Sequence, residues 1–211
     1  TDIQELPAAS DCRDALSGGA PDVHVHRKGN LLIDFVQSYG DADAAVEAAP
    51  CRLTVSLKQH RGGAHPIEGR GLIASFDAAT DLLTVWSSTQ LAHEARYCIM
   101  KMLGLDENRI RVVTPDVGGG FGAKFILYPE EVAISAASLL LQRPVKWIED
   151  RREHFLASIQ ERDQYWDVEV GFDQDGRLLG ARGTMISDAG AYTYQGINLH
   201  YNASTNFPGP Y

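Results

Sequence analysis

The segment Thr114–Glu130 reads TPDVGGGFGAKFILYPE, and glycine fills four of the five positions 118–122, with Phe121 as the exception. Glycine loses more conformational freedom on folding than any other residue, so a run this dense indicates that the backbone turns tightly or approaches another group closely. Arg109–Thr114, before the run, has strand character, and Pro129, after it, is typical of the first turn of a helix. The sequence therefore predicts a glycine-rich connection between a strand and a helix.

Further strands are expected on both sides of this connection. Apolar and polar residues alternate in Cys51–Gln59, as in a half-buried strand, and a second strand is expected at Leu82–Ser87, after the turn signal FDAATD. Beyond the glycine run, VKWIED at 145–150 also has strand character. Two long alternating segments at 163–172 and 177–187 flank DQDG, which is typical of a hairpin.

Two helices are expected. The first follows the N-cap candidates Ser88 and Thr89, has one apolar face over residues 91–103 and ends at Gly104. The second begins at Pro129 with two acidic residues in its first turn, and it is apolar nearly all round, which predicts burial. The mixed order of strands and helices indicates an α/β or an α+β protein, and we expect α+β.

Composition limits the classes of function. A net charge of −9 over 211 residues argues against nucleic-acid binding, which needs clustered Lys and Arg. No apolar run is long enough to predict a transmembrane segment. Cys12, Cys51 and Cys98 lie far apart and indicate neither a zinc site nor a disulfide framework, so we expect a reducing, cytoplasmic setting.

The domain organisation is predicted from the distribution of turn-forming residues. Residues 1–45 contain Gly, Pro, Asp and Ser throughout and show no sustained period, which predicts an extended N-terminal arm. Residues 46–211 are predicted to form one domain. The chain starts without Met, and its last residues, NFPGPY, lead toward another element, so we expect a fragment that is truncated at the C-terminus.

The glycine run allows three interpretations. GGGFGA fits the dinucleotide-binding pattern G-x-G-x-x-A, although Lys124–Tyr128 separate it from the helix and Glu149 lies well beyond the roughly 20 residues expected for the acidic partner. Consecutive backbone N–H groups could instead form a nest for anionic oxygens, with the Phe121 ring excluding water. The third interpretation is a crossing of two closely packed backbones without a ligand.

Six segments of the chain resemble, in register, a known enzyme family. They are HPIEGRGLIASFD, LLTVWSSTQLAHEAR, LGLDENRIRVVTPDVGGGFGAK, YPEEVAISAASLLLQRPVKWIEDRREHF, DGRLLGARG and SDAGAY. In this order they are similar to successive parts of the molybdenum-cofactor (large) subunit of the xanthine dehydrogenase, aldehyde oxidase and carbon monoxide dehydrogenase family. The resemblance covers about Leu6–Tyr211 and implies the first molybdopterin-cofactor-binding domain of such a subunit.

The resemblance implies roles for particular residues. Gln90 of SSTQ matches the glutamine whose amide approaches an oxo ligand of molybdenum, and Phe121 matches a residue whose backbone amide lies beside the metal's ligands. Gly119, Gly120 and Gly122 would then make room for the cofactor. Glu68 and Arg70 also match the family and could form a buried pair under the site or a salt bridge that stabilises a turn.

The same resemblance implies a chemistry and a set of partners. The family oxidises carbon with oxygen from water and passes electrons through iron–sulfur clusters to FAD, using molybdenum–molybdopterin or its cytosine dinucleotide. Phe125 replaces the glutamate that contacts purines, so we expect a small aldehyde, N-heterocycle or CO-like substrate. The family's general-base glutamate is expected beyond Tyr211. The expected partners are the rest of the large subunit, an Fe–S subunit and an FAD subunit, in an oligomer.

Two hypotheses of other classes remain open from the sequence. One is the nucleotide-binding module described above. The other is a non-catalytic assembly domain that keeps the fold without the metal. If the resemblance identifies the chain correctly, the isolated 211 residues should be metal-free and inactive, because the family's cofactor lies between two large domains.

Overall fold

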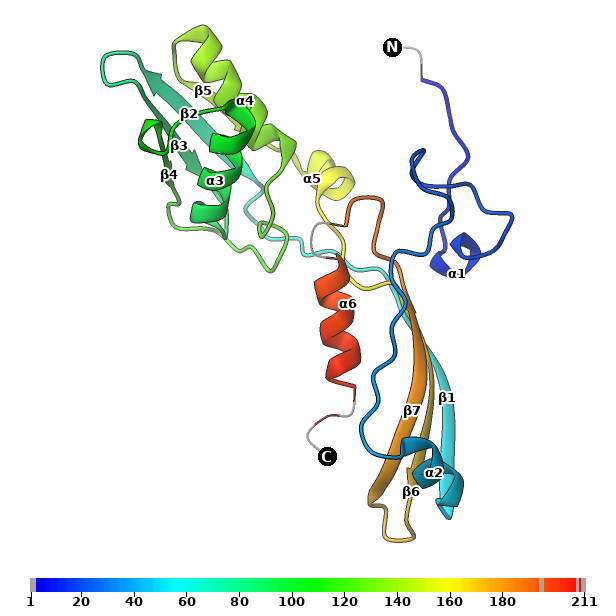
Figure 1. Ribbon diagram of the computed structural model, residues 1–211. Coiled ribbons are helices and arrows are strands. Elements are labelled where there is room, and N and C mark those ends of the chain that lie inside the picture. The colour runs from blue at the N-terminus through cyan, green and yellow to red at the C-terminus, as the bar shows by residue number, and fades with distance from the viewer. Residues whose placement is uncertain (1–2, 194–195, 208, 210–211) are drawn as a thin grey trace. The chain divides into compact units, whose positions relative to one another are not determined.

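The computed structural model describes residues 3–193, 196–207 and 209. Figure 1 shows the elements in chain order. The chain folds into two compact units, which we call the loop unit (Gly62–Glu161) and the hairpin unit (Thr1–Arg61 with Arg162–Tyr211). The loop unit is one continuous segment, whereas the hairpin unit is assembled from the two segments that flank it. The domain boundaries expected from the sequence, 1–45 and 46–211, stay a prediction.

The loop unit is a sheet with helices packed against one face. Its four strands lie in the order β4-β3-β2-β5, and only the β3–β4 pair is parallel. The strands are β2 (Gly71–Asp77), β3 (Leu82–Ser87), β4 (Ile110–Val113) and β5 (Val145–Ile148), and the helices are α3 (Ala92–Leu103), α4 (Pro129–Leu141) and α5 (Arg151–Ala157), with a short 3₁₀ turn η1 at Glu107–Arg109. Alternate residues of β2 and β3 pack against Ile99 of α3 to form the core.

The predicted limits of α3 are nearly correct. Gly104 adopts the left-handed conformation (φ 64°), and its N–H donates to the Met100 carbonyl, as expected for a glycine that ends a helix. The start differs from the prediction, because the N-cap is Leu91 and no side chain caps the helix. Instead, the Thr89 hydroxyl accepts the Leu91 N–H at 3.1 Å. The Thr89 side chain therefore binds the backbone just before the helix and does not cap its first turn.

Helix α4 begins at Pro129 as predicted, but its burial differs from the prediction. The residues of α4 that are fully buried include Ser135 and Ser138, while Leu140 is 83% exposed. Each serine hydroxyl bonds to a backbone carbonyl, that of Glu131 at 2.6 Å and that of Arg143 at 2.9 Å. Small, internally bonded side chains let the helix approach the sheet closely. The helix is thus buried on its serine side, and its apolar composition misled the prediction.

The sequence analysis did not identify two elements of the loop unit. Strand β2 lies at the centre of the sheet, paired with both β3 and β5. Helix α5 begins in a charged stretch, where Asp150 and Glu153 form a capping box. The charges at 150–153 therefore start a helix.

The hairpin unit contains an antiparallel sheet of three strands in the order β1-β6-β7. The predicted hairpin is present, with a turn at 173–176 between its strands, and β1 joins it along β6. Helix α2 packs on β6 and β7, where a Cβ at Gly171 would lie 2.7 Å from the Cβ of Ala49. The elements are α1 (Cys12–Ala15), α2 (Ala42–Ala48), β1 (Cys51–Gln59), β6 (Gln164–Phe172), β7 (Leu178–Ser187) and α6 (Gly196–Thr205).

The expected α+β class is confirmed, since both units combine helices with mainly antiparallel sheets. Among the described residues, none of the helices is long and apolar enough to cross a membrane.

Candidate functional site

The glycine run belongs to a long loop between β4 and α4, which we call the glycine loop (residues 115–128). Gln90 contacts this loop through its backbone and its side chain. Its N–H donates to the Lys124 carbonyl at 2.9 Å, and its Oε1 accepts the N–H groups of Gly122 (3.1 Å) and Lys124 (3.2 Å). Because both partners of the side chain are donors, they fix Oε1 toward the loop. The exposed Gln90 side chain therefore has its NH₂ group left as a donor.

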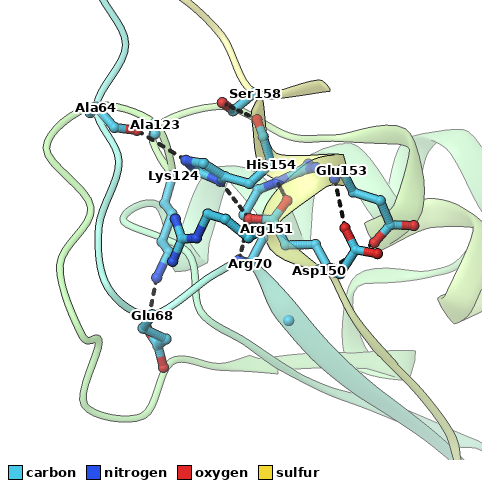
Figure 2. A network of polar contacts seen from close by, with 12 residues as sticks. Ala64, Glu68, Arg70, Ala123, Lys124, Asp150, Arg151, Glu153, His154 and Ser158 are labelled. Atoms are coloured by element: carbon cyan, nitrogen blue, oxygen red, sulfur yellow. Dashed lines mark hydrogen bonds and ion pairs between the residues drawn. The ribbon is translucent and has the colours of Figure 1, made fainter. Parts of the chain in front are cut away.

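A second side chain holds the loop at both ends of the glycine run. One carboxylate oxygen of Glu68 accepts the Gly118 N–H at 2.7 Å and the Lys124 Nζ at 2.7 Å. Figure 2 shows this contact between Glu68 and Lys124. Lys124 is only 2% exposed, so its ammonium has been removed from water. The hydrogen bond from Lys124 is the main reason that the pKa of Glu68 lies below its ordinary value.

Contacts within the chain explain three of the four glycines of the run. A Cβ at Gly118 would lie 2.6 Å from the Glu68 Cβ, and one at Gly120 would lie 2.5 Å from the Gln90 side-chain amide. Gly119 has φ 93° and faces the Phe121 ring. A Cβ at Gly122 would meet no atom within 4 Å, but this residue has φ 92°, a conformation that residues with a side chain rarely adopt. The run is thus required by Glu68, Gln90 and the backbone path, whatever the loop binds.

Phe121 is the residue of the loop with the most unusual conformation. It has φ 50°, which costs a residue with a Cβ about 1–2 kcal/mol, and its ring is 78% exposed. Within the described part of the chain, no hydrogen bond is formed by the N–H groups of Gly119, Gly120 and Phe121. Strain, an exposed ring and consecutive unused donors at one place point to a binding function.

Beneath the loop lies a buried network of charges. The Glu149 carboxylate accepts the Arg70 N–H (2.6 Å), the Arg70 Nε (2.7 Å) and the His154 Nδ1 (2.6 Å). Figure 2 shows the contact between His154 and Ala64. The His154 Nε2 lies 3.1 Å from the Ala64 carbonyl oxygen. Both ring nitrogens of His154 therefore face acceptors. Burial would raise the pKa of Glu149, but these donors outweigh it and hold the pKa below its ordinary value.

Arg70 connects this network to the start of α4. Its guanidinium stacks on the Tyr128 ring, 3.7 Å from the ring centre, and Nη1 lies 3.3 Å from a Glu130 oxygen. Its buried Nη2 has no partner within the described residues and borders a cavity of about 10 Å³, which is room for one water. Glu131 lines the same cavity, and burial raises the pKa of its carboxyl. The base of the loop is therefore a nearly filled polar core.

The structure brings most of the residues singled out from the sequence to one place. Gln90 contacts Gly122 directly and lies against Gly120, while Gly119 and Phe121 occupy the exposed part of the loop. Phe125, which is 40% exposed, donates its N–H to the Gly122 carbonyl at 3.1 Å.

Other expectations from the sequence need correction. Glu68 and Arg70 do not pair with each other, because Glu68 binds Lys124 and Arg70 binds Glu149. The sequence reasoning missed the buried roles of Lys124, Glu149 and His154. No spacing signal identifies these residues, because each binds a partner from a distant segment: Lys124 binds Glu68, Glu149 binds Arg70 and the His154 ring contacts Ala64.

The chain was compared with protein families and with curated proteins. The molybdopterin cofactor-binding domain family matches residues 23–211. The large subunit of nicotine 6-hydroxylase from Paenarthrobacter nicotinovorans is 37% identical over 191 residues, which are 90% of this chain and 23% of that protein. The carbon monoxide dehydrogenase large chain from Hydrogenophaga pseudoflava is 36% identical over 90% of this chain and 25% of that protein. The chain thus spans about a quarter of the curated relatives it matches.

Solved structures give the same result for the fold. Quinoline 2-oxidoreductase from Pseudomonas putida 86 superposes with a TM-score of 0.83 at 33% identity, over 90% of this chain and 24% of that chain. CO dehydrogenase from Oligotropha carboxidovorans superposes with a TM-score of 0.78 at 30% identity, over 87% of this chain and 24% of that chain.

Proposed function

Because the chain belongs to the molybdopterin cofactor-binding domain family and is part of a molybdenum hydroxylase large subunit, we propose that its glycine loop and Gln90 form one wall of a molybdenum–pterin site. When bound, such a cofactor supplies the two-electron oxidation of a carbon centre with oxygen from water. The observation that supports this role most directly is the fixed Gln90 amide beside the unused N–H groups of the loop.

The donors present fit an oxygen-rich, metal-bearing group. Gln90 offers its NH₂ group, because the loop occupies its Oε1, and Gly119, Gly120 and Phe121 offer backbone N–H groups. All of these donors are neutral and do not titrate, so they would bind oxo ligands without changing the charge of the centre at any working pH. A Cβ at Gly120 would collide with the Gln90 amide, so the glycine leaves room for that amide. Gln90 and Phe121 would thus contact the ligands of the metal.

The proposed substrate is a small neutral molecule, and an N-heterocycle fits best. Phe125 stands where a purine-binding glutamate would be, and its half-buried ring offers an apolar contact without a charge. Nicotine 6-hydroxylase and quinoline 2-oxidoreductase, two of the similar proteins, are named for heterocyclic compounds. An aldehyde or a CO-like substrate remains in the proposed class. Electrons would pass to Fe–S and FAD partners, and the general base would come from outside this chain.

A nucleotide-binding function is disfavoured by the topology. A dinucleotide-binding unit needs two parallel strands that are connected by the helix after the glycine turn. Here β4 and β5, which flank the glycine loop and α4, lie at opposite edges of the sheet. The loop also continues for several residues after Gly122 before α4 begins at Pro129. Its N–H groups are therefore not those of a helix N-terminus.

The test is the replacement Gln90→Ala in the complete gene product, with Gln174→Ala in the exposed hairpin turn as the matched control. Loss of one preorganised donor should slow turnover of N-heterocycles by about 10- to 1,000-fold. The control should behave as wild type. Molybdenum and pterin content is measured in parallel by elemental analysis and pterin fluorescence. Wild-type turnover by Gln90→Ala would remove Gln90 from the site, and a wild-type protein without molybdenum would favour a non-catalytic assembly domain.

A further inference from the structure

The glycine loop has a defined shape that depends on two side chains outside the glycine run. Gln90 bonds the N–H groups at its C-terminal side, while Glu68 bonds the N–H of Gly118 at its start. Glu68 also accepts a hydrogen bond from the Lys124 ammonium. One carboxylate therefore connects Gly118 with Lys124, which lies six positions later in the loop. The N–H groups between these anchor points are the ones that remain unused.

The chemistry of this anchor is unusual for a surface loop. The Lys124 side chain is 1% exposed, whereas that of Glu68 is 42% exposed. A buried ammonium without a partner is strongly unfavourable, so burial of Lys124 depends on the carboxylate. Glu68 in turn can move only by giving up the Lys124 ammonium and the Gly118 N–H together. A Cβ at position 118 would lie 2.6 Å from the Glu68 Cβ, so glycine is required for this close approach.

We propose that Glu68 is a positioning residue, which acts through Lys124 and the Gly118 N–H to fix the glycine loop in its binding shape before the cofactor arrives. This inference rests on the proposed function, and it adds that the site is preorganised by an ion pair that itself does not touch the cofactor. Preorganisation avoids the cost of ordering the loop on binding. It also keeps the N–H groups of Gly119–Phe121 unpaired, since the ends of the loop cannot close on them.

Two single variants and their combination test the inference in the complete gene product. Glu68→Gln removes the charge and one acceptor function, and Lys124→Met keeps the straight side chain but removes the ammonium. Each should weaken cofactor retention on dialysis by roughly 10- to 100-fold, as for other residues that orient metal-site groups. The double variant should be no worse than the worse single variant, because both break the same contact. Glu107→Gln, which breaks the exposed pair with Arg96 in the same unit, is the matched control and should change nothing.

Two further measurements separate positioning from general stability. Backbone hydrogen exchange of the cofactor-free protein should be faster at Gly122 and Lys124 in both variants, with the core strands β2 and β3 unchanged. The electron paramagnetic resonance signal of the partly reduced protein should shift in the variants but not in Glu107→Gln. Should Glu68→Gln fail to fold, Lys124→Met gives the same test, because the charge that it leaves unpaired is that of Glu68, the more exposed partner.

The outcomes distinguish this inference from the proposed function. Unchanged loop exchange and unchanged cofactor retention in both variants would overturn the positioning role, even if the wild type holds molybdenum. If the wild type holds neither molybdenum nor pterin, the proposed function fails. In that case faster loop exchange in the variants still supports preorganisation by Glu68, and unchanged exchange refutes it.

Discussion

A network of charged side chains in the loop unit can be compared with one in the hairpin unit, and the two networks differ in burial. In the loop unit the side chains of Arg70, Glu149 and His154 are 6%, 0% and 0% exposed. In the hairpin unit the Arg182 side chain is 32% exposed and joins strand β7 to helix α2 and strand β6. Its partners Glu169, Glu47 and Asp43 are 23%, 58% and 83% exposed.

The two networks use similar groups but should respond differently to damage. If a partner of Arg182 is removed, water reaches the freed groups and other carboxylates remain close by. If a partner in the buried network is removed, Arg70 keeps its charge with little solvent to replace the lost bond. A list of ion pairs therefore says little about stability until the exposure of each group is known.

The largest effect is expected for Glu149→Gln. The change leaves the buried Arg70 guanidinium without the carboxylate that it binds, and we expect the free energy of unfolding at pH 7 to fall by about 3–5 kcal/mol. Urea unfolding followed by tryptophan fluorescence measures this change, since Trp86 and Trp147 both lie in the loop unit. A loss below about 1 kcal/mol, the range of surface pairs, would contradict the distinction between the two networks.

The contribution of Glu149 should also depend on pH. Its folded pKa is held below the ordinary value of 4.5, so the unfolded chain takes up this proton first as pH falls. The stabilisation is complete above 4.5 and is lost as pH drops through the folded pKa. The difference in unfolding free energy between wild type and Glu149→Gln should therefore be constant from pH 7 to about 5.5 and shrink below about 4.5. If this difference in unfolding free energy grew as the pH fell, it would have the opposite sign and contradict the prediction.

A smaller effect is expected for His154→Asn. The Asn amide can replace Nδ1 as a donor to Glu149, but it cannot reach the Ala64 carbonyl as well. One buried hydrogen bond is lost, which costs about 1–3 kcal/mol. The same urea titration measures it, and protection of the backbone near Ala64 by hydrogen exchange shows whether the segment loosens. A loss equal to that of Glu149→Gln would mean that Asn does not replace Nδ1.

The smallest effect is expected for Arg182→Gln in the exposed network. The hydrogen bonds that Arg182 donates to Glu47, Glu169 and Asp43 raise its pKa above the ordinary value, which keeps it charged at any working pH. Its partners are open to water, so the unfolding midpoint in urea should change by only a small fraction of the shift seen for Glu149→Gln. Salt at about 0.5 M should reduce even that difference. If Arg182→Gln shifted the urea midpoint as much as Glu149→Gln does, the expected difference between the exposed and the buried network would be refuted.

Local patterns predicted much of the fold. The limits of β1 and β3, the hairpin turn and the end of α3 at Gly104 follow from alternation, turn residues and a glycine. Strand β2 was missed because Leu72, Ile73 and Ala74 form an apolar run, so its sequence shows little alternation. The burial of α4 differed from the prediction because the Ser135 and Ser138 hydroxyls bond to the carbonyls of Glu131 and Arg143, which hydropathy does not register.

The candidate site was predictable only in part. The glycine run and Gln90 are adjacent in the fold as the family resemblance implied, while their roles toward a cofactor stay predictions. Lys124, Glu149 and His154 could not be found from the sequence, because their significance depends on burial. A lysine in a loop and a histidine in a charged helix look solvent-exposed until tertiary contacts enclose them.

The discontinuous build of the hairpin unit has a consequence for the order in which the protein is synthesised. Strand β1 pairs with β6, and Cys51 lies opposite Phe172, so the ribosome must add more than 100 residues before β1 finds its partner. At about 5–20 residues per second, this interval lasts on the order of 5–20 seconds. The loop unit is continuous and emerges during that time, so it can fold while β1 is still an unpaired edge. The period of greatest risk of aggregation for the nascent chain therefore falls before β6 leaves the ribosome.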